Sequence, residues 1–126
     1  MRTAILSIRD RLDRVGVLLS GLCAVHCLAS LVLVAGLGLG GEYLLAPAIH
    51  QVGLVLAIAV GSITLVMGMA RHGDPVPLHA GAAGIALMAV ALFTGHGKAE
   101  AVLTIAGVGG LAFAHLRNMR HNHCAA

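Results

Sequence analysis

Four long runs of this sequence contain no Asp, Glu, Lys or Arg, and they limit the fold more than any other feature. The runs are Val15–Gly41, Tyr43–Ala70, Pro75–Gly97 and Ala101–Leu116. About 20 helical residues cross the hydrocarbon core of a bilayer, so the first three runs are long enough, whereas the fourth reaches only about 24 Å. With 59% hydrophobic and 10% charged residues, the chain is suited to lipid. The prediction is an all-α fold, a four-helix transmembrane bundle.

Glycine, proline and charged residues set the boundaries of the four spans. We expect spans at about residues 15–38, 48–70, 77–94 and 101–116, joined by short turns such as "HGDPVP" and "GHG". Short connections make neighbouring helices antiparallel. Neither terminal segment holds enough apolar side chains for a core of its own. The chain then divides into a basic cytoplasmic flank at 1–14, one membrane domain at 15–116 and a cytoplasmic tail at 117–126.

The distribution of Lys and Arg predicts the orientation in the membrane. Of the eight such residues, only Lys98 falls on the side opposite the two ends and the middle loop. Cytoplasmic segments carry the excess of Lys and Arg, so both termini are expected in the cytoplasm of a multi-pass protein of the inner (plasma) membrane. The formal net charge of +3 reflects this asymmetry, and no basic stripe with interleaved aromatics indicates nucleic acid as a partner.

Side chains suited to catalysis do not form a recognisable arrangement. The carboxylates lie in loops or flanks without pairing, and the serines within the spans lack an evident base. No glycine-rich phosphate loop follows a strand. The chain is therefore not expected to be an enzyme.

The segment "GLCAVHC" places two thiols and an imidazole inside the first apolar run. At helical spacing, Cys23, His26 and Cys27 point into one arc of about 100°. Thiolate and imidazole suit Zn(II), Cu(I) or Hg(II), and polar groups at this depth in a membrane tend to be functional. The alternative is that the cysteines only pack and that His26 is satisfied by a serine or a carbonyl. We interpret the triplet as a metal site, and the same arc also carries Gly16, Ser20 and Ser30.

Further candidate ligands lie toward both sides of the membrane. Those expected near the outer surface are His50, His96, Glu42 and Glu100. Those expected near the inner surface are His72, His79, His115, His121, His123 and Cys124. Within the inner set, His79 and His115 are the better candidates because they sit inside apolar patterns, and the tail "HNHC" is a candidate cytoplasmic acceptor. Ligands are thus expected outside, midway and inside.

These features together resemble the MerC family of mercury-resistance membrane proteins. The resemblance rests on "LDRVGVLLSGLCAVHCLAS", "IHQVGLVLA", "GHGKAEAVLTIAGVGGLAFAH" and a tail that ends near a cysteine, and it covers roughly residues 12–124. It implies movement of mercuric ion across the inner membrane, from a cysteine pair in the first helix to a cytoplasmic thiol. By position, Cys23 and Cys27 would be the membrane ligands and Cys124 the inner one.

The cysteine pattern departs from that of the mercury transporters, whose first-helix cysteines are adjacent and whose tail carries a further pair. Here a histidine stands within a spaced pair, and the tail has one cysteine. Mercuric ion favours two thiolates in a line, whereas two thiolates and an imidazole fit tetrahedral Zn(II), or Cu(I). The metal therefore stays open among Hg²⁺, Zn²⁺ and Cu⁺.

Two other functions remain as alternatives. His79 and His115 are a candidate axial pair for haem in an electron-transfer protein, although the chain offers few aromatic walls for a haem. The second alternative is that the chain is a small accessory membrane subunit without chemistry of its own. Its expected partners are membrane lipid, the metal ion and a periplasmic or cytoplasmic metal carrier. A homodimer is also expected, because four short helices leave little room for a pore.

Overall fold

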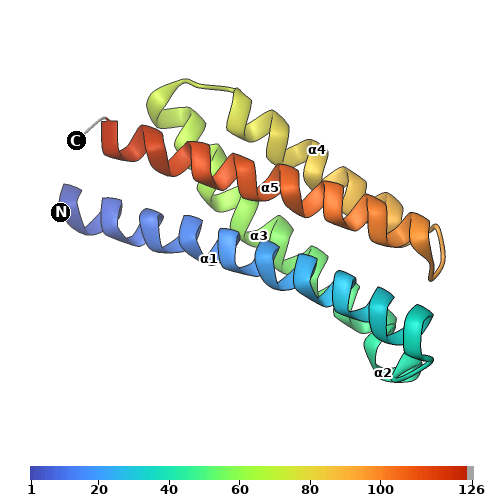
Figure 1. The fold of residues 1–126 in the computed structure, drawn as a ribbon. Helices are drawn as coiled ribbons and strands as arrows, with labels where there is room; N and C mark the ends of the chain where they lie inside the picture. Colours follow the sequence, from blue (N-terminus) through green and yellow to red (C-terminus); the bar gives the residue numbers. More distant parts are fainter. Residues whose placement is uncertain (125–126) are drawn as a thin grey trace.

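The computed structural model describes residues 1–124, and it confirms the predicted all-α fold. Of the described residues, 88% are helical, and none of them forms a strand. The elements are α1 (Arg2–Ser30), the π-helix η1 (Leu31–Gly36), α2 (Gly41–Leu44), α3 (Pro47–His72), α4 (Val76–Ala91) and α5 (Lys98–Cys124) (Figure 1). α1 continues directly into η1, and α2 is a single short turn before α3.

Three of the helices are long and apolar enough to cross a membrane. They cover Thr3–Gly36, Gly41–His72 and Lys98–Cys124, whereas α4 is a shorter apolar helix of 16 residues. α5 contains the fourth run and continues past the charged Arg117 to a length of 27 residues. α4, the helix of the third run, ends at Ala91, before Gly95 with its positive φ of 73°.

Glycine and proline fix the ends of the other helices. Gly38, which follows η1, has a positive φ of 67°. Pro47 is the first residue of α3, where its missing N–H removes no helical hydrogen bond. Gly73 ends α3 in the left-handed conformation, with φ 72°. In the turn to α4, the Val76 N–H donates to Asp74 Oδ1 over 3.0 Å.

The helices lie roughly side by side, with both termini at one end of the bundle and α2 at the other (Figure 1). α5 is the central helix, packed against both α1 and α4. At the α4–α5 crossing, Gly84 and Gly107 bring the two backbones together: a Cβ on Gly84 would lie 2.5 Å from the Gly107 carbonyl oxygen. Such small-residue contacts are typical of helix pairs in membranes.

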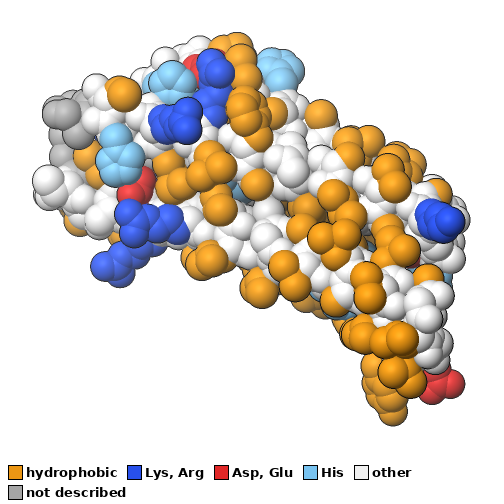
Figure 2. Space-filling view, in the orientation of Figure 1, with side chains coloured by type: hydrophobic (Ala, Val, Ile, Leu, Met, Phe, Trp, Pro, Cys, Tyr) orange, Lys and Arg blue, Asp and Glu red, His pale blue; other side chains and the backbone are white. Residues whose placement is uncertain are grey.

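The surface of the molecule is largely apolar between two charged ends. On α1 the exposed residues include Leu18, Leu22, Val25 and Leu28. Lys and Arg side chains gather at the end that carries the termini (Figure 2). Lys98 begins α5 at the opposite end. An apolar belt of this kind is what a multi-pass membrane protein presents to lipid.

Candidate metal centre

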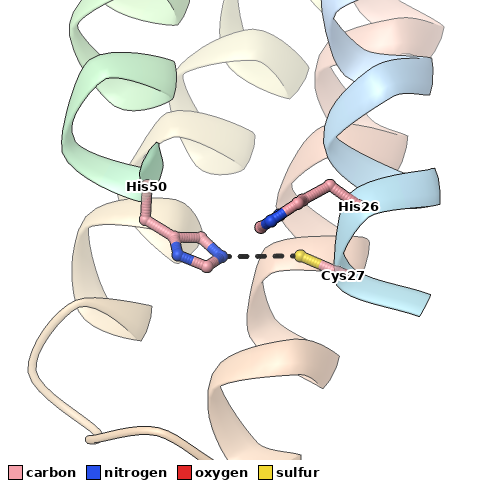
Figure 3. Close-up of side chains that lie close together, drawn as sticks. All are labelled: His26, Cys27 and His50. Carbon is pink, nitrogen blue, oxygen red and sulfur yellow. Dashed lines mark hydrogen bonds between the residues drawn. The ribbon is translucent and has the colours of Figure 1, made fainter. Parts of the chain in front are cut away.

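Three ligand side chains from two helices converge near the outer end of the bundle. His26 and Cys27 come from α1 and His50 comes from the start of α3 (Figure 3). Their ligand atoms all lie within 4.8 Å of one another. Within residues 1–124 this is the one such group of three or more His, Cys, Asp or Glu residues. We call it the outer cluster.

The side chains of the outer cluster are held close without being locked together. Cys27 Sγ lies 3.6 Å from His50 Nε2, and the rings of His26 and His50 meet edge to face with centroids 5.7 Å apart. Cys27 is buried, and the two histidines are half-buried. The Ser30 hydroxyl donates to the His26 carbonyl over 2.7 Å and lies 3.5 Å from His26 Nε2. One thiol and two imidazoles therefore face a common point.

A buried carboxylate stands behind the outer cluster. Glu100, at the start of α5, lies with Oε1 3.6 Å from His50 Nδ1 and Oε2 3.1 Å from His96 Nδ1. Metal-ligating histidines commonly turn their second ring nitrogen toward a carboxylate, which fixes the tautomer. In this arrangement a proton on His50 Nδ1 faces Glu100, and the Nε2 lone pair faces Cys27.

A cavity of about 240 Å³ connects the outer cluster with the outer joints of the bundle. Its walls include Leu45 before α3 and Gly97 before α5. Cys27, His50, His96 and Glu100 line the same cavity, so a thiol, two imidazoles and a carboxylate surround it.

Cys23 lies one helical turn farther in and does not belong to the outer cluster. Its thiol is half-buried and faces α3, where a Cβ on Gly53 would lie 3.4 Å from the sulfur. The predicted triplet is thus divided: His26 and Cys27 join His50, while Cys23 lines a second, inner cavity. The sequence pointed to His50 as a ligand but contained no signal for the register that brings it to Cys27.

A second polar group lies deeper, between α1 and α5, and we call it the inner network. His115 Nδ1 lies 2.7 Å from Asp13 Oδ1, and both side chains are fully buried. Asn118 Nδ2 donates to Asp13 Oδ2 over 2.8 Å. The Thr64 hydroxyl of α3 lies 3.4 Å from His115 Nδ1. Sequence reasoning missed Asp13 because its charge placed it in the flank, although it lies on the helical face that carries Cys23.

Comparison with known families identifies the chain. The model of the MerC mercury resistance protein family matches residues 13–120. The chain belongs to the MerC family. The matched range includes the outer cluster as well as Asp13 and His115, and it ends before Cys124. A search of curated proteins and a search of solved structures found no match.

Except for His96 and Glu100, which line the same cavity as the outer cluster, the remaining predicted ligands of this MerC family member lie apart from it. At the inner end, His72 Nε2 lies 2.8 Å from Asn118 Oδ1, and His72 stacks on His121 with centroids 4.6 Å apart. His79 is exposed on α4, with Nδ1 donating to the Pro75 carbonyl over 2.8 Å, so it does not share the buried surroundings of His115. The other exposed candidates are Glu42, His96, His123 and Cys124.

The turn between α3 and α4 is fastened to α5 through Asp74. Arg117 Nε donates to Asp74 Oδ2 over 2.7 Å, and His121 Nε2 lies 2.8 Å from the same oxygen. The Arg117 hydrogen bond is the main reason why the pKa of Asp74 is lowered to about 2. The Val76 N–H adds to this effect. These contacts hold together the end of the bundle that carries the termini.

Proposed function

We propose that this protein captures a thiophilic metal ion at the outer cluster and moves it across the inner membrane toward the cytoplasm. The observation that carries the proposal is the convergence of His26, Cys27 and His50 beside a cavity that reaches the outer joints. Family membership supports mercuric ion as the substrate. The ligand set, one thiolate and two imidazoles, also suits Zn(II), and Cu(I) is a third candidate.

The chemistry of capture follows from the residues around the cluster. Binding requires the Cys27 thiol to lose its proton, so metal uptake is accompanied by proton release. Glu100 supplies negative charge next to His50 and His96, which favours an approaching cation. The ion then passes to the Cys23 thiolate, one turn farther in, and leaves toward Cys124 in the cytoplasm. The chain carries no recognisable energy-coupling motif, so the ion moves down its own gradient or with the help of a metal carrier.

Metal titration of the purified full-length protein tests the proposal. We expect one high-affinity ion per chain for Hg(II) or Zn(II), measured by competition with a chelator. Cys27→Ser is expected to lower the affinity by more than about 100-fold, because even changes to residues behind the ligands cost 10–100-fold. The matched control is His79→Ala, which removes an exposed imidazole outside the cluster.

Two results would contradict this function. Equal affinities for Cys27→Ser and His79→Ala would remove the outer cluster from metal binding. An absorption spectrum of the purified protein with haem bands would favour the electron-transfer alternative, for which an axial histidine pair is needed. A protein that binds none of the three metals would return the chain to the class of accessory subunits.

A further inference from the structure

A second cavity lies on the cytoplasmic side of the outer cluster. Its volume is about 40 Å³, and it lies between α1, α3, α4 and α5 with a mostly apolar lining that also includes Ser20. A space of about 10–15 Å³ holds a water molecule, so this cavity has room for an ion. The two metal-ligand side chains in its wall are Cys23 and His115.

His115 stands in the wall of this cavity and carries an unpartnered nitrogen. The residue is completely buried, and its Nε2 has no hydrogen-bond partner. The ring lies directly against Gly16, where a Cβ would overlap the imidazole. Buried polar atoms almost always have a partner, so a bare Nε2 on a cavity wall requires an explanation.

Asp13 fixes the state of that nitrogen. The Oδ1 atom of Asp13 lies 2.7 Å from His115 Nδ1, so the ring donates its proton there and keeps the lone pair on Nε2. Asn118 holds the second carboxylate oxygen over 2.8 Å, which prevents Asp13 from turning away. A carboxylate behind a histidine is the usual support for a metal-ligating imidazole. The inner network thus presents a fixed acceptor atom to the cavity that Cys23 also lines.

We infer that Cys23 and His115 form a second station for the transported metal ion, with Asp13 as the positioning residue of His115. This inference rests on the proposed function and adds a path inside the membrane. The ion exchanges Cys27 for Cys23 and then Cys23 for His115 Nε2. At the first exchange the Cys23 thiol gives its proton to the released Cys27 thiolate, and at the second the released Cys23 thiolate takes up a proton from solvent while the ion binds the lone pair of His115 Nε2. The oxidation state of the ion does not change. A purely structural Asp13–His115 pair would have no need for a free nitrogen on a thiol-lined cavity.

X-ray absorption on a metal-loaded variant tests the station directly. In full-length Cys27→Ser protein loaded with one equivalent of Hg(II), we expect sulfur and nitrogen in the metal shell. Adding His115→Gln should remove the nitrogen. If that variant does not fold, a triple variant replaces it, in which Cys27→Ser is combined with His26→Ala and His50→Ala. This protein keeps His115 but lacks the two imidazoles of the outer cluster, and we expect nitrogen to remain in its metal shell. A shell without nitrogen in Cys27→Ser, or unchanged nitrogen after His115→Gln, would overturn the inference.

Uptake by proteoliposomes separates the second station from the first. For His115→Gln we expect Hg(II) affinity at the outer cluster within about twofold of the wild type and delivery to an internal thiol chelator slowed at least about tenfold. The control is His79→Ala, because His79 is exposed on α4 and lines neither cavity. If the wild type binds no ion, the proposed function fails. If wild type and His115→Gln bind and deliver ions equally well, only the second station fails.

Discussion

The outer cluster and the inner network use similar side chains in opposite ways. In the outer cluster, His26 and His50 are half-buried beside a cavity of about 240 Å³, and their contacts with Cys27 are loose. In the inner network, Asp13 and His115 are fully buried and held at 2.7 Å. The first arrangement leaves several ligand atoms free to close on an ion. The second fixes every polar atom of the pair except His115 Nε2, so it combines structural support with a single available ligand.

The largest effect on folding is expected from the inner network. Asp13→Ala would leave His115 Nδ1 and the Asn118 amide without their carboxylate inside the bundle. A buried donor left without its partner typically costs about 1–3 kcal/mol of unfolding free energy, and this substitution leaves two such donors. Denaturant titration in mixed micelles measures this loss. A loss below about 1 kcal/mol would show that the pair does not hold α1 to α5.

At the outer cluster, Glu100→Gln is expected to weaken metal binding rather than to destabilise the fold. The substitution keeps the shape of the side chain but removes the charge that faces His50 and His96. We expect Zn(II) affinity to fall by about 10–100-fold, the usual effect of changing the residue behind a metal-ligating histidine. The unfolding free energy should change much less than for Asp13→Ala. A large loss of stability with unchanged affinity would reverse the roles assigned to the two regions.

A smaller and metal-dependent effect is expected from His26→Ala. Zinc would lose one ligand of a tetrahedral shell, whereas mercuric ion can remain bound to Cys27 and, one turn away, Cys23. Zinc affinity is therefore expected to fall about tenfold more than mercury affinity. Both metals are to be titrated into the same variant. Equal losses would mean that His26 serves both ions alike, and an unchanged zinc affinity would make it a packing residue bonded to Ser30.

The sequence predicted the elements of this fold better than their register. Uncharged runs were enough to find four helices, because apolar length is what a bilayer requires. The same rule does not give the length of α5, since a helix continues through charged residues such as Arg117 once it leaves the lipid. It also assigned Asp13 to the flank, although the fold buries this carboxylate against His115.

The candidate site was predictable only within one helix. The spacing of His26 and Cys27 placed them on one face, as the structure also shows (Figure 3). The addition of His50 and the separation of Cys23 depend on how α3 packs against α1, and that packing is decided by close contacts such as Gly53 with Cys23. Spacing along a chain carries no information about these contacts between helices.

The smallest effect is expected at the turn between α3 and α4, where Asp74 is held by Arg117 and His121. The folded-state pKa of Asp74 is lowered to about 2 from an ordinary value of 3.8, mainly by the Arg117 hydrogen bond. A lowered carboxyl pKa contributes stability that is fully present above the unfolded-state pKa and is lost as the pH falls through the folded-state pKa.

The Asp74→Asn variant lacks this contribution at every pH, whereas the wild type should lose it between about pH 4 and pH 2. The unfolding temperatures of the two proteins should therefore converge over this range. Because exposed ion pairs contribute little, the difference at neutral pH is expected to be small and to shrink further in high salt. Parallel curves for the two proteins over this pH range would show that Asp74 does not fasten the turn between α3 and α4 to α5.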